Sequence, residues 1–208
     1  MDRIDADAAR EVFVDAFQRL GLPTVIRTDN GVPFATTGLH GLSRLSVLWL
    51  RAGVRFERIE PGCPEQNGRH ERMHRTLKAE TTRPAAPNLL QQQERFDDFV
   101  DEFNQRRPHQ ALENRRPAEV YSPSSRSFTR LAELAYPTHD DQLRVDGHGH
   151  VFLLRRNYFL TKALGGETVG VREEDDGRWI VTFATMDLGH IDPYSRVFVP
   201  NALPLQSA

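Results

Sequence analysis

The stretch Pro61–Glu80, PGCPEQNGRHERMHRTLKAE, decides how the rest of the chain is interpreted. Its first half is rich in Pro, Gly and Asn, which predicts a loop, and its second half predicts a helix. That helix carries the carboxylate of Glu71 among arginines and histidines. Farther upstream, the segment Arg27-Thr28-Asp29-Asn30-Gly31 places another carboxylate at the end of a short apolar strand. Asp29 and Glu71 are therefore the first candidate functional residues.

The composition predicts a water-soluble protein. The chain has 208 residues, 38% hydrophobic and 27% charged, which is enough for one ordinary domain or for a medium domain and a small one. No apolar run reaches the length of a membrane span, and the N-terminus is charged where a signal peptide would be apolar. Cys63 is the single cysteine, so an internal disulfide or an all-cysteine zinc site is excluded.

The charge balance limits how this chain binds polyanions. The formal net charge is −2 and the isoelectric point is about 6.4. A protein held on nucleic acid by bulk charge would be basic. Any nucleic-acid contact must therefore come from local cationic patches.

The residues before the deciding stretch predict alternating helices and strands. Apolar spacing predicts helices over 5–20 and 39–52, the second with Leu42, Leu45, Leu48 and Trp49 inward. Short strands are predicted over 24–28 and 54–59. This order indicates an α/β fold, in which loops at the carboxyl ends of the strands bear the carboxylates.

The residues after the loop predict three more helices. The first ends near Thr82, and the second covers residues 89–106. Pro117 suits the first position of a third, short helix. The expected inward residues of the second helix are apolar: Leu90, Phe96, Phe99, Val100 and Phe103.

The C-terminal third changes to a β pattern. Ser, Pro and Arg at 122–126 predict a linker. Two dipeptides, Asp146-Gly147 and Asp176-Gly177, are two-residue hairpin signals, and the short strands between turns favour a small antiparallel barrel. The expected strands are 142–145, 151–154, 167–172, 179–183, 189–191 and 196–199. The expected domains are a core over 1–121, a linker over 122–136, a β-rich domain over 137–200 and a tail over 201–208.

Three blocks in this order resemble the catalytic core of insertion-sequence transposases of the retroviral-integrase type, the DDE superfamily. The blocks are RTDNG with Phe34 after it, PG…QNGRHERMHRTLK from Pro61 to Lys78, and FNQRRPHQAL from Phe103 with Pro117-Ala118-Glu119 after it. The resemblance implies a partial RNase H-like integrase core, with helices and a reduced sheet, over roughly residues 20–120. It implies a protein of DNA integration and transposition.

The resemblance implies metal-dependent DNA strand transfer, with Asp29 and Glu71 as catalytic and metal-ligating residues. In the family, three carboxylates hold divalent metals, because hard oxygen ligands suit Mg²⁺ or Mn²⁺ and paired ions stabilise an in-line phosphoryl displacement. Glu71 fits the family's Asn-Gly-x-x-Glu spacing better than Glu65 does. The interval after Asp29 is longer than the family's commonest one, and we assign the excess to residues 36–42. Glu65 therefore stays as an alternative.

The helix that bears Glu71 is also the predicted nucleic-acid contact. Glu71, Arg75 and Lys78 are four and three residues apart, which places them on one helical face. Cations there would hold phosphates near the metals. The predicted DNA-binding residues are Asn30, Gln66, Asn67, Arg69, Arg72, Arg75, Lys78, Arg107 and His109.

One carboxylate of the family's set has no match in this sequence. It precedes Asp29 on the first strand of the family's core, whereas Asp2, Asp5, Asp7 and Asp15 fall in or beside the first predicted helix. We therefore expect the chain to begin inside the catalytic domain, to bind Mg²⁺ weakly or not at all, and not to join DNA strands alone.

The expected partners are DNA and a further copy or another transposase chain, with no membrane. The expected location is the cytoplasm, with association with the nucleoid when DNA is bound. Two alternatives stay open: a non-catalytic DNA-binding or assembly fragment that associates with a full-length transposase, and an interaction module without a DNA role. DNA binding that weakens steeply with salt would exclude the interaction module and favour the two DNA-binding functions.

Overall fold

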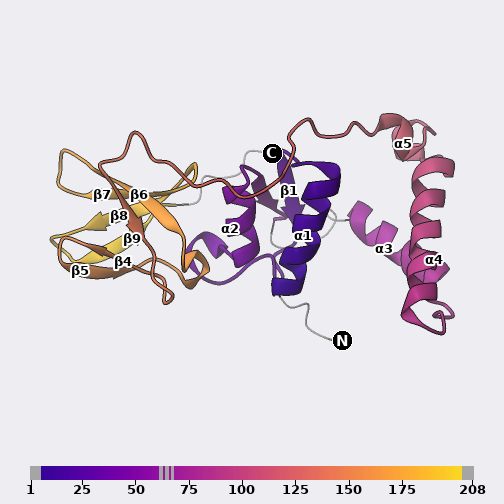
Figure 1. Cartoon of the computed structure of the whole chain (residues 1–208), viewed down its shortest axis with the longest axis horizontal. Helices are drawn as coiled ribbons and strands as arrows, with labels where there is room; N and C mark the ends of the chain where they lie inside the picture. The colour runs from indigo at the N-terminus through magenta and orange to yellow at the C-terminus, as the bar shows by residue number, and fades with distance from the viewer. Residues whose placement is uncertain (1–5, 61–62, 64–65, 67, 203–208) are drawn as a thin grey trace. The chain divides into compact units, whose positions relative to one another are not determined.

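The computed structural model describes residues 6–60, 63, 66 and 68–202 (Figure 1). The chain divides into two compact units. Unit 1 combines Met1–Arg58 with Ser124–Ala208, and unit 2 is Ile59–Pro123. The fold is a mixture of helices and sheets.

The first half of unit 1 follows the predicted order of helix, strand, helix and strand. These elements are α1 (Ala6–Leu20), β1 (Val25–Thr28), α2 (Arg44–Arg51) and β2 (Arg55–Arg58). In the described residues, β1 and β2 form a two-stranded parallel sheet, with Val25 opposite Arg55. The predicted reduced sheet is therefore confirmed, while the RNase H-like topology stays a prediction.

The predicted helix over 39–52 is wrong at its start. A 3₁₀ turn, η1 (Leu39–Gly41), comes first, and His40 has a positive φ of 49° that interrupts the helix. The helix α2 begins after Ser43, whose side chain and that of Ser46 form a reciprocal capping box. Local capping therefore sets the helix boundary inside a longer apolar pattern. The predicted inward residues Leu42, Leu45, Leu48 and Trp49 are all buried.

Helix α2 contributes to two apolar clusters of unit 1. Leu45, Leu48 and Trp49 are buried with Phe17 of α1, and the Phe13 ring meets the Trp49 ring edge-on at 5.0 Å. The other cluster contains Leu42 and Val47 with buried side chains of the C-terminal strands. One helix thus serves two cores, because apolar side chains cover both of its sides.

The C-terminal part of unit 1 contains a five-stranded antiparallel sheet and a separate hairpin. The sheet order is β3 (Asp141–Arg144), β6 (Thr168–Glu173), β7 (Trp179–Phe183), β8 (Met186–Asp192) and β9 (Val197–Pro200). The hairpin pairs β4 (His150–Leu153) with β5 (Arg156–Phe159), and the 3₁₀ turn η5 (Lys162–Leu164) follows. The predicted antiparallel sheet is confirmed; its closure into a barrel stays a prediction.

One of the two predicted hairpin turns is wrong. Asp146-Gly147 does not join paired strands, because β3 pairs with β6 and β4 pairs with β5. The turn at Asp176-Gly177 does join the paired strands β6 and β7, with Gly177 at φ 80°. Strand β5 was not predicted, since its sequence RNYF contains no clear alternation.

The segment predicted as a linker is bound to unit 1. Arg126 donates hydrogen bonds to the carbonyl oxygens of Pro23 at 3.0 Å and Gly53 at 2.6 Å. Ser124 Oγ donates to the carbonyl oxygen of Leu22 at 2.6 Å. Phe128 is buried in the same cluster as Trp49. These contacts explain why residues 124–136 cluster with unit 1.

Unit 2 contains α3 (Gly68–Thr81), α4 (Leu89–Asp101), a π-helical turn η3 (Glu102–Arg106), a 3₁₀ turn η4 (Gln110–Leu112) and α5 (Pro117–Val120). The side chain of Asn88 caps α4 by accepting the Gln91 N–H at 2.9 Å. Phe99 is buried as predicted, but Leu90 and Val100 are 73% and 52% exposed, so their inward placement was wrong. A single apolar face does not specify which of its residues are covered.

Candidate functional site

Asp29 immediately follows β1 and is exposed. Its Oδ1 accepts the N–H of Gly31 at 2.9 Å, the local turn that Asp-Asn-Gly favours. The ring of Phe34, in the same loop, stacks on Trp49 with centroids 6.3 Å apart. The loop is therefore attached to the core, and the carboxylate of Asp29 is held near solvent.

Arg27, two residues before Asp29, is engaged across the sheet. Its Nε and Nη2 donate to Glu57 Oε2 at 3.2 and 2.9 Å. These two residues are register partners of β1 and β2. Arg27 thus holds the strand pair together next to the Asp29 turn.

Glu71 lies in the first turn of α3 and is exposed. The opposite interior side of this helix is formed by partly buried Met73, Thr76 and Leu77 and by buried Thr81. Thr81 Oγ1 donates to the Leu77 carbonyl oxygen at 2.7 Å. The amphipathic pattern therefore places Glu71, Arg75 and Lys78 on the side of α3 away from these packed residues.

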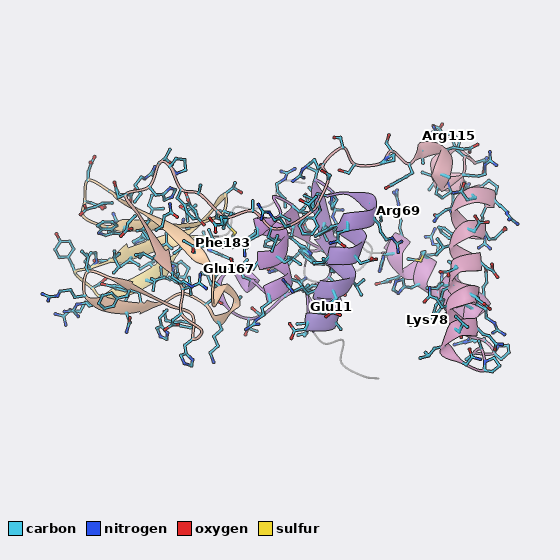
Figure 2. The ribbon with its side chains drawn as sticks, viewed as in Figure 1. Glu11, Arg69, Lys78, Arg115, Glu167 and Phe183 are labelled. Atoms are coloured by element: carbon cyan, nitrogen blue, oxygen red, sulfur yellow. The ribbon has the colours of Figure 1, made fainter. Side chains whose placement is uncertain are left out.

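The four predicted DNA-binding cations of α3 are exposed: Arg69, Arg72, Arg75 and Lys78. Figure 2 labels Arg69 and Lys78 near the two ends of this helix. Within the described residues, none of the four has an ion pair. They form a cationic surface, available to a polyanion, around the Glu71 carboxylate.

His70 and His74 also lie on α3, one helical turn apart, with ring centroids separated by 4.3 Å. Loss of hydration lowers the pKa of His74, and the nearby positive charges of His70 and Lys78 lower it further. The lowered pKa favours a neutral His74 imidazole within the cationic surface.

Arg107 and His109 have partners within unit 2. Arg107 donates to both carboxylate oxygens of Glu80, and its guanidinium lies over the Phe99 and Phe103 rings at 6.0 and 5.9 Å. Hydrogen bonding to Glu80 raises the pKa of Arg107. The Nε2 of His109 is 3.3 Å from the Phe103 carbonyl oxygen. Both side chains therefore join the end of α4 and η3 to neighbouring segments.

The remaining predicted residues are Asn30, Gln66, Asn67 and the alternative ligand Glu65. Asn30 is exposed beside Asp29. Gln66 Oε1 accepts the N–H of Glu60 at 2.9 Å. Asn67 and the alternative ligand Glu65 fall outside the described residues.

The two candidate carboxylates belong to different units, Asp29 to unit 1 and Glu71 to unit 2. In the part of the chain that the structure describes, no three His, Cys, Asp or Glu side chains gather to hold a metal ion. Both residues supply exposed carboxylate oxygens, the donor type that Mg²⁺ and Mn²⁺ prefer. No helix of the described residues is long and apolar enough to cross a membrane.

One protein-family model is similar to the part of the chain that contains α3. The family model described as the integrase core domain matches residues 52–117, which include Glu71 and the cations of α3. Residues 52–117 are therefore similar to the integrase core domain. The resemblance that the sequence motifs indicated is therefore confirmed for this part of the chain.

Two viral polyproteins are similar over the same share of the chain. The Gag-Pol polyprotein of Baboon endogenous virus (strain M7) is 36% identical over 75 residues, 36% of this chain and 4% of the polyprotein. The Pol polyprotein of Feline endogenous virus ECE1 is 36% identical over 77 residues, 36% of this chain and 7% of that protein. The chain thus spans a small fraction of these relatives' length.

A solved structure also matches. It is the cryoEM structure of a simian T-cell lymphotropic virus intasome in complex with PP2A regulatory subunit B56 gamma. The match covers 86% of this chain and 59% of that one, with 18% identity and a TM-score of 0.47.

The sequence motifs did not indicate three arginines of unit 1, Arg10, Arg44 and Arg51, which line a common pocket. The signal that would have found two of them is spacing. Arg44 and Arg51 are seven residues apart, which places them on one face of α2.

Proposed function

We propose that this chain takes part in DNA integration or transposition, with Asp29 and Glu71 as metal-ligating residues of a strand-transfer site. The observation that carries the proposal is the integrase-core match over residues 52–117, in which Glu71 lies on a helix with four exposed cations. A cationic helix surface neutralises DNA phosphates, and a carboxylate within it suits a divalent cation.

The protein groups have distinct roles in this proposal. Arg69, Arg72, Arg75 and Lys78 bind the phosphate backbone and position it, with Asn30, Gln66, Asn67, Arg107 and His109 as further contacts. Asp29 and Glu71 would hold Mg²⁺ or Mn²⁺. When bound, such ions stabilise the charge on the attacking and leaving oxygens of a phosphodiester exchange.

A second candidate function is DNA binding or assembly without chemistry, in association with a full-length transposase. The same exposed cations of α3 support it, because phosphate contacts require no metal. We propose that either function involves a further copy or another transposase chain. Support comes from the two-stranded sheet, since within the described residues β1 pairs with β2 alone and such a sheet is marginal by itself.

Binding of Mn²⁺ to the protein–DNA complex, followed by electron paramagnetic resonance, separates the two candidates. For a strand-transfer site, we expect weak Mn²⁺ uptake that Asp29→Asn and Glu71→Gln each abolish. Glu94→Gln, which removes an exposed carboxylate of α4, is the matched control and leaves uptake unchanged.

Uptake that survives both ligand substitutions would contradict the assignment of Asp29 and Glu71. DNA binding without any Mn²⁺ uptake by the unaltered protein would overturn the strand-transfer function and support the second candidate. The oligomeric proposal is tested by light scattering of the purified protein with and without DNA. A strictly monomeric protein under both conditions would refute self-association.

A further inference from the structure

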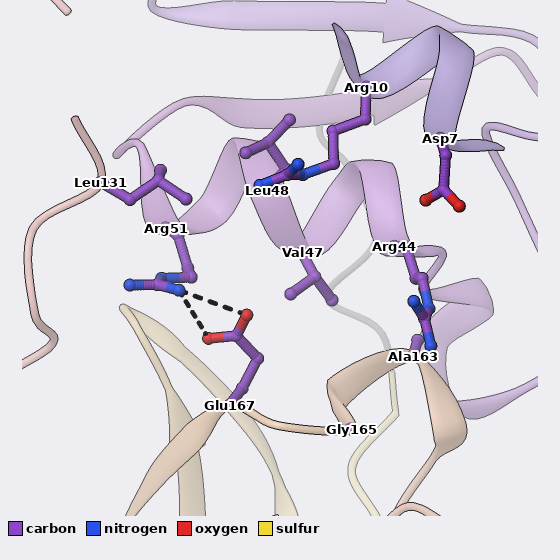
Figure 3. A pocket seen from close by; sticks show the side chains of 10 residues that line it. All are labelled: Asp7, Arg10, Arg44, Val47, Leu48, Arg51, Leu131, Ala163, Gly165 and Glu167. Atoms are coloured by element: carbon purple, nitrogen blue, oxygen red, sulfur yellow. Dashed lines mark hydrogen bonds and ion pairs between the residues drawn. The ribbon is translucent and has the colours of Figure 1, made fainter. Parts of the chain in front are cut away.

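Unit 1 contains a pocket of about 270 Å³ that is distinct from the residues assigned above (Figure 3). Its apolar floor includes Val47 and Leu48 of α2 and Leu131. Three arginines, Arg10, Arg44 and Arg51, stand around Val47 in Figure 3. The remaining lining residues are Asp7, Ala163, Gly165 and Glu167.

One wall of the pocket is a preorganised ion pair. Arg51 Nη1 lies 3.2 Å from Glu167 Oε2, and the two side chains are 23% and 20% exposed. Arg51 Nη2 donates to the Ala132 carbonyl oxygen at 3.1 Å. The Arg51 Nε is buried and has no hydrogen-bond acceptor. Protein atoms cover this N–H, so it reports on the pocket wall and does not contact a ligand in the pocket.

The other two guanidinium groups, those of Arg10 and Arg44, belong to exposed residues. Among the described residues, neither Arg10 nor Arg44 makes a hydrogen bond or an ion pair. The Glu167 charge is balanced by Arg51, so Arg10 and Arg44 outnumber the single remaining carboxylate, Asp7. Exposed arginines beside a pocket suit an anion, because the guanidinium fork matches phosphate oxygens.

We propose that this pocket binds a phosphate group through Arg10 and Arg44. The phosphate belongs either to a DNA backbone or to a free phosphate compound. The DNA source rests on the proposed function, whereas phosphate binding itself does not.

The first arm of the test titrates inorganic phosphate into the whole protein and follows the Arg51 Nε–Hε resonance by NMR. We expect a saturable shift, and the double variant Arg10→Gln/Arg44→Gln should weaken binding by at least about tenfold through loss of charge-assisted hydrogen bonds. The control Arg19→Gln/Arg172→Gln removes the same charge from exposed positions of unit 1 and should leave it unchanged. Asp7→Asn should strengthen binding severalfold, because it removes the opposing carboxylate.

Any of three outcomes would overturn the phosphate site. The Arg51 resonance would not move on addition of phosphate, the control would lose as much phosphate affinity as the double variant, or Asp7→Asn would leave that affinity unchanged. The Asp7→Asn result keeps the test decisive if the double variant fails to fold.

The second arm measures duplex DNA binding by fluorescence anisotropy at several salt concentrations. Loss of one phosphate contact in Arg10→Gln/Arg44→Gln should lower the salt slope by about 0.9. An unchanged slope alongside retained phosphate binding would assign the pocket to free phosphate and overturn the DNA source. If the unaltered protein binds no DNA, the proposed function fails, and the phosphate titration still decides the pocket.

Discussion

The guanidinium of Arg107 donates two hydrogen bonds to the carboxylate of Glu80, Nη1 to Oε1 at 3.1 Å and Nη2 to Oε2 at 3.0 Å. Glu80 is at the end of α3 and Arg107 follows η3, so the pair closes a long loop within unit 2. The orientation of the cation-bearing helix relative to α4 thus depends on an interaction between distant positions.

Arg107→Lys should lower the free energy of unfolding by about 1 kcal/mol, because lysine cannot form the two-point contact with Glu80. The estimate is modest since both side chains are partly exposed, 32% and 43%. Urea denaturation followed by circular dichroism measures it. Arg106→Lys is the control, because its pair with Asp101 is more exposed. Equal effects of the two substitutions would contradict a special role for the Arg107–Glu80 pair.

Gly41→Ala should destabilise unit 1 by roughly 1–2 kcal/mol. Gly41 has a φ of 63°, which strains any L side chain, and an added Cβ would displace the Arg58 guanidinium. That guanidinium donates to the Gly41 carbonyl oxygen at 2.7 Å, so the substitution also disturbs a hydrogen bond. We expect the melting temperature to fall for Gly41→Ala. The control Gly147→Ala should leave it unchanged, because an added Cβ there meets no atom. An unchanged melting temperature for both variants would refute the steric argument.

Replacing Arg69, Arg72, Arg75 or Lys78 singly with Gln should weaken duplex DNA binding severalfold. Each lost phosphate contact should lower the salt slope by about 0.9. Fluorescence anisotropy across a salt series measures both quantities. Arg106→Gln, an exposed cation of unit 2 outside α3, should change neither. If the control lost as much DNA affinity as the α3 variants, binding would depend on the overall charge of the protein and not on the surface of α3.

Glu119 should titrate far below an ordinary glutamate. Hydrogen bonding to the Arg116 guanidinium, with a further bond from the Arg116 N–H, lowers the pKa of Glu119 from 4.5 to about 2. Because the folded-state pKa is depressed, the stabilisation is complete above pH 4.5 and is lost as pH falls toward 2. NMR titration of the carboxyl carbon should show the low pKa, and Arg116→Gln should return it toward 4.5. A Glu119 pKa near 4.5 in the unaltered protein would refute the pairing.

Local sequence signals predicted most elements of the fold. The 3.6-residue apolar period identified α1 and α4, and Pro117 marked the start of α5. The start of α2 was wrong because the apolar pattern runs past the Ser43 cap. The exposure of Leu90 and the pairing of β3 with β6 were missed for a different reason. Both depend on which segments pack together, and periodicity contains no information about partners.

The sequence by itself determined the deciding stretch: a helix from Gly68 that presents Glu71 among cations, within a recognisable integrase-core segment. These properties follow from helical spacing and from residue types at fixed intervals. Only the tertiary structure showed that Arg107 is held by Glu80, 27 residues away, and that Arg51 meets Glu167 across 116 residues. Such pairs arise because chain packing decides which charges are neutralised internally. Among the described residues, Arg10 and Arg44 make no ion pair and stay available to a ligand.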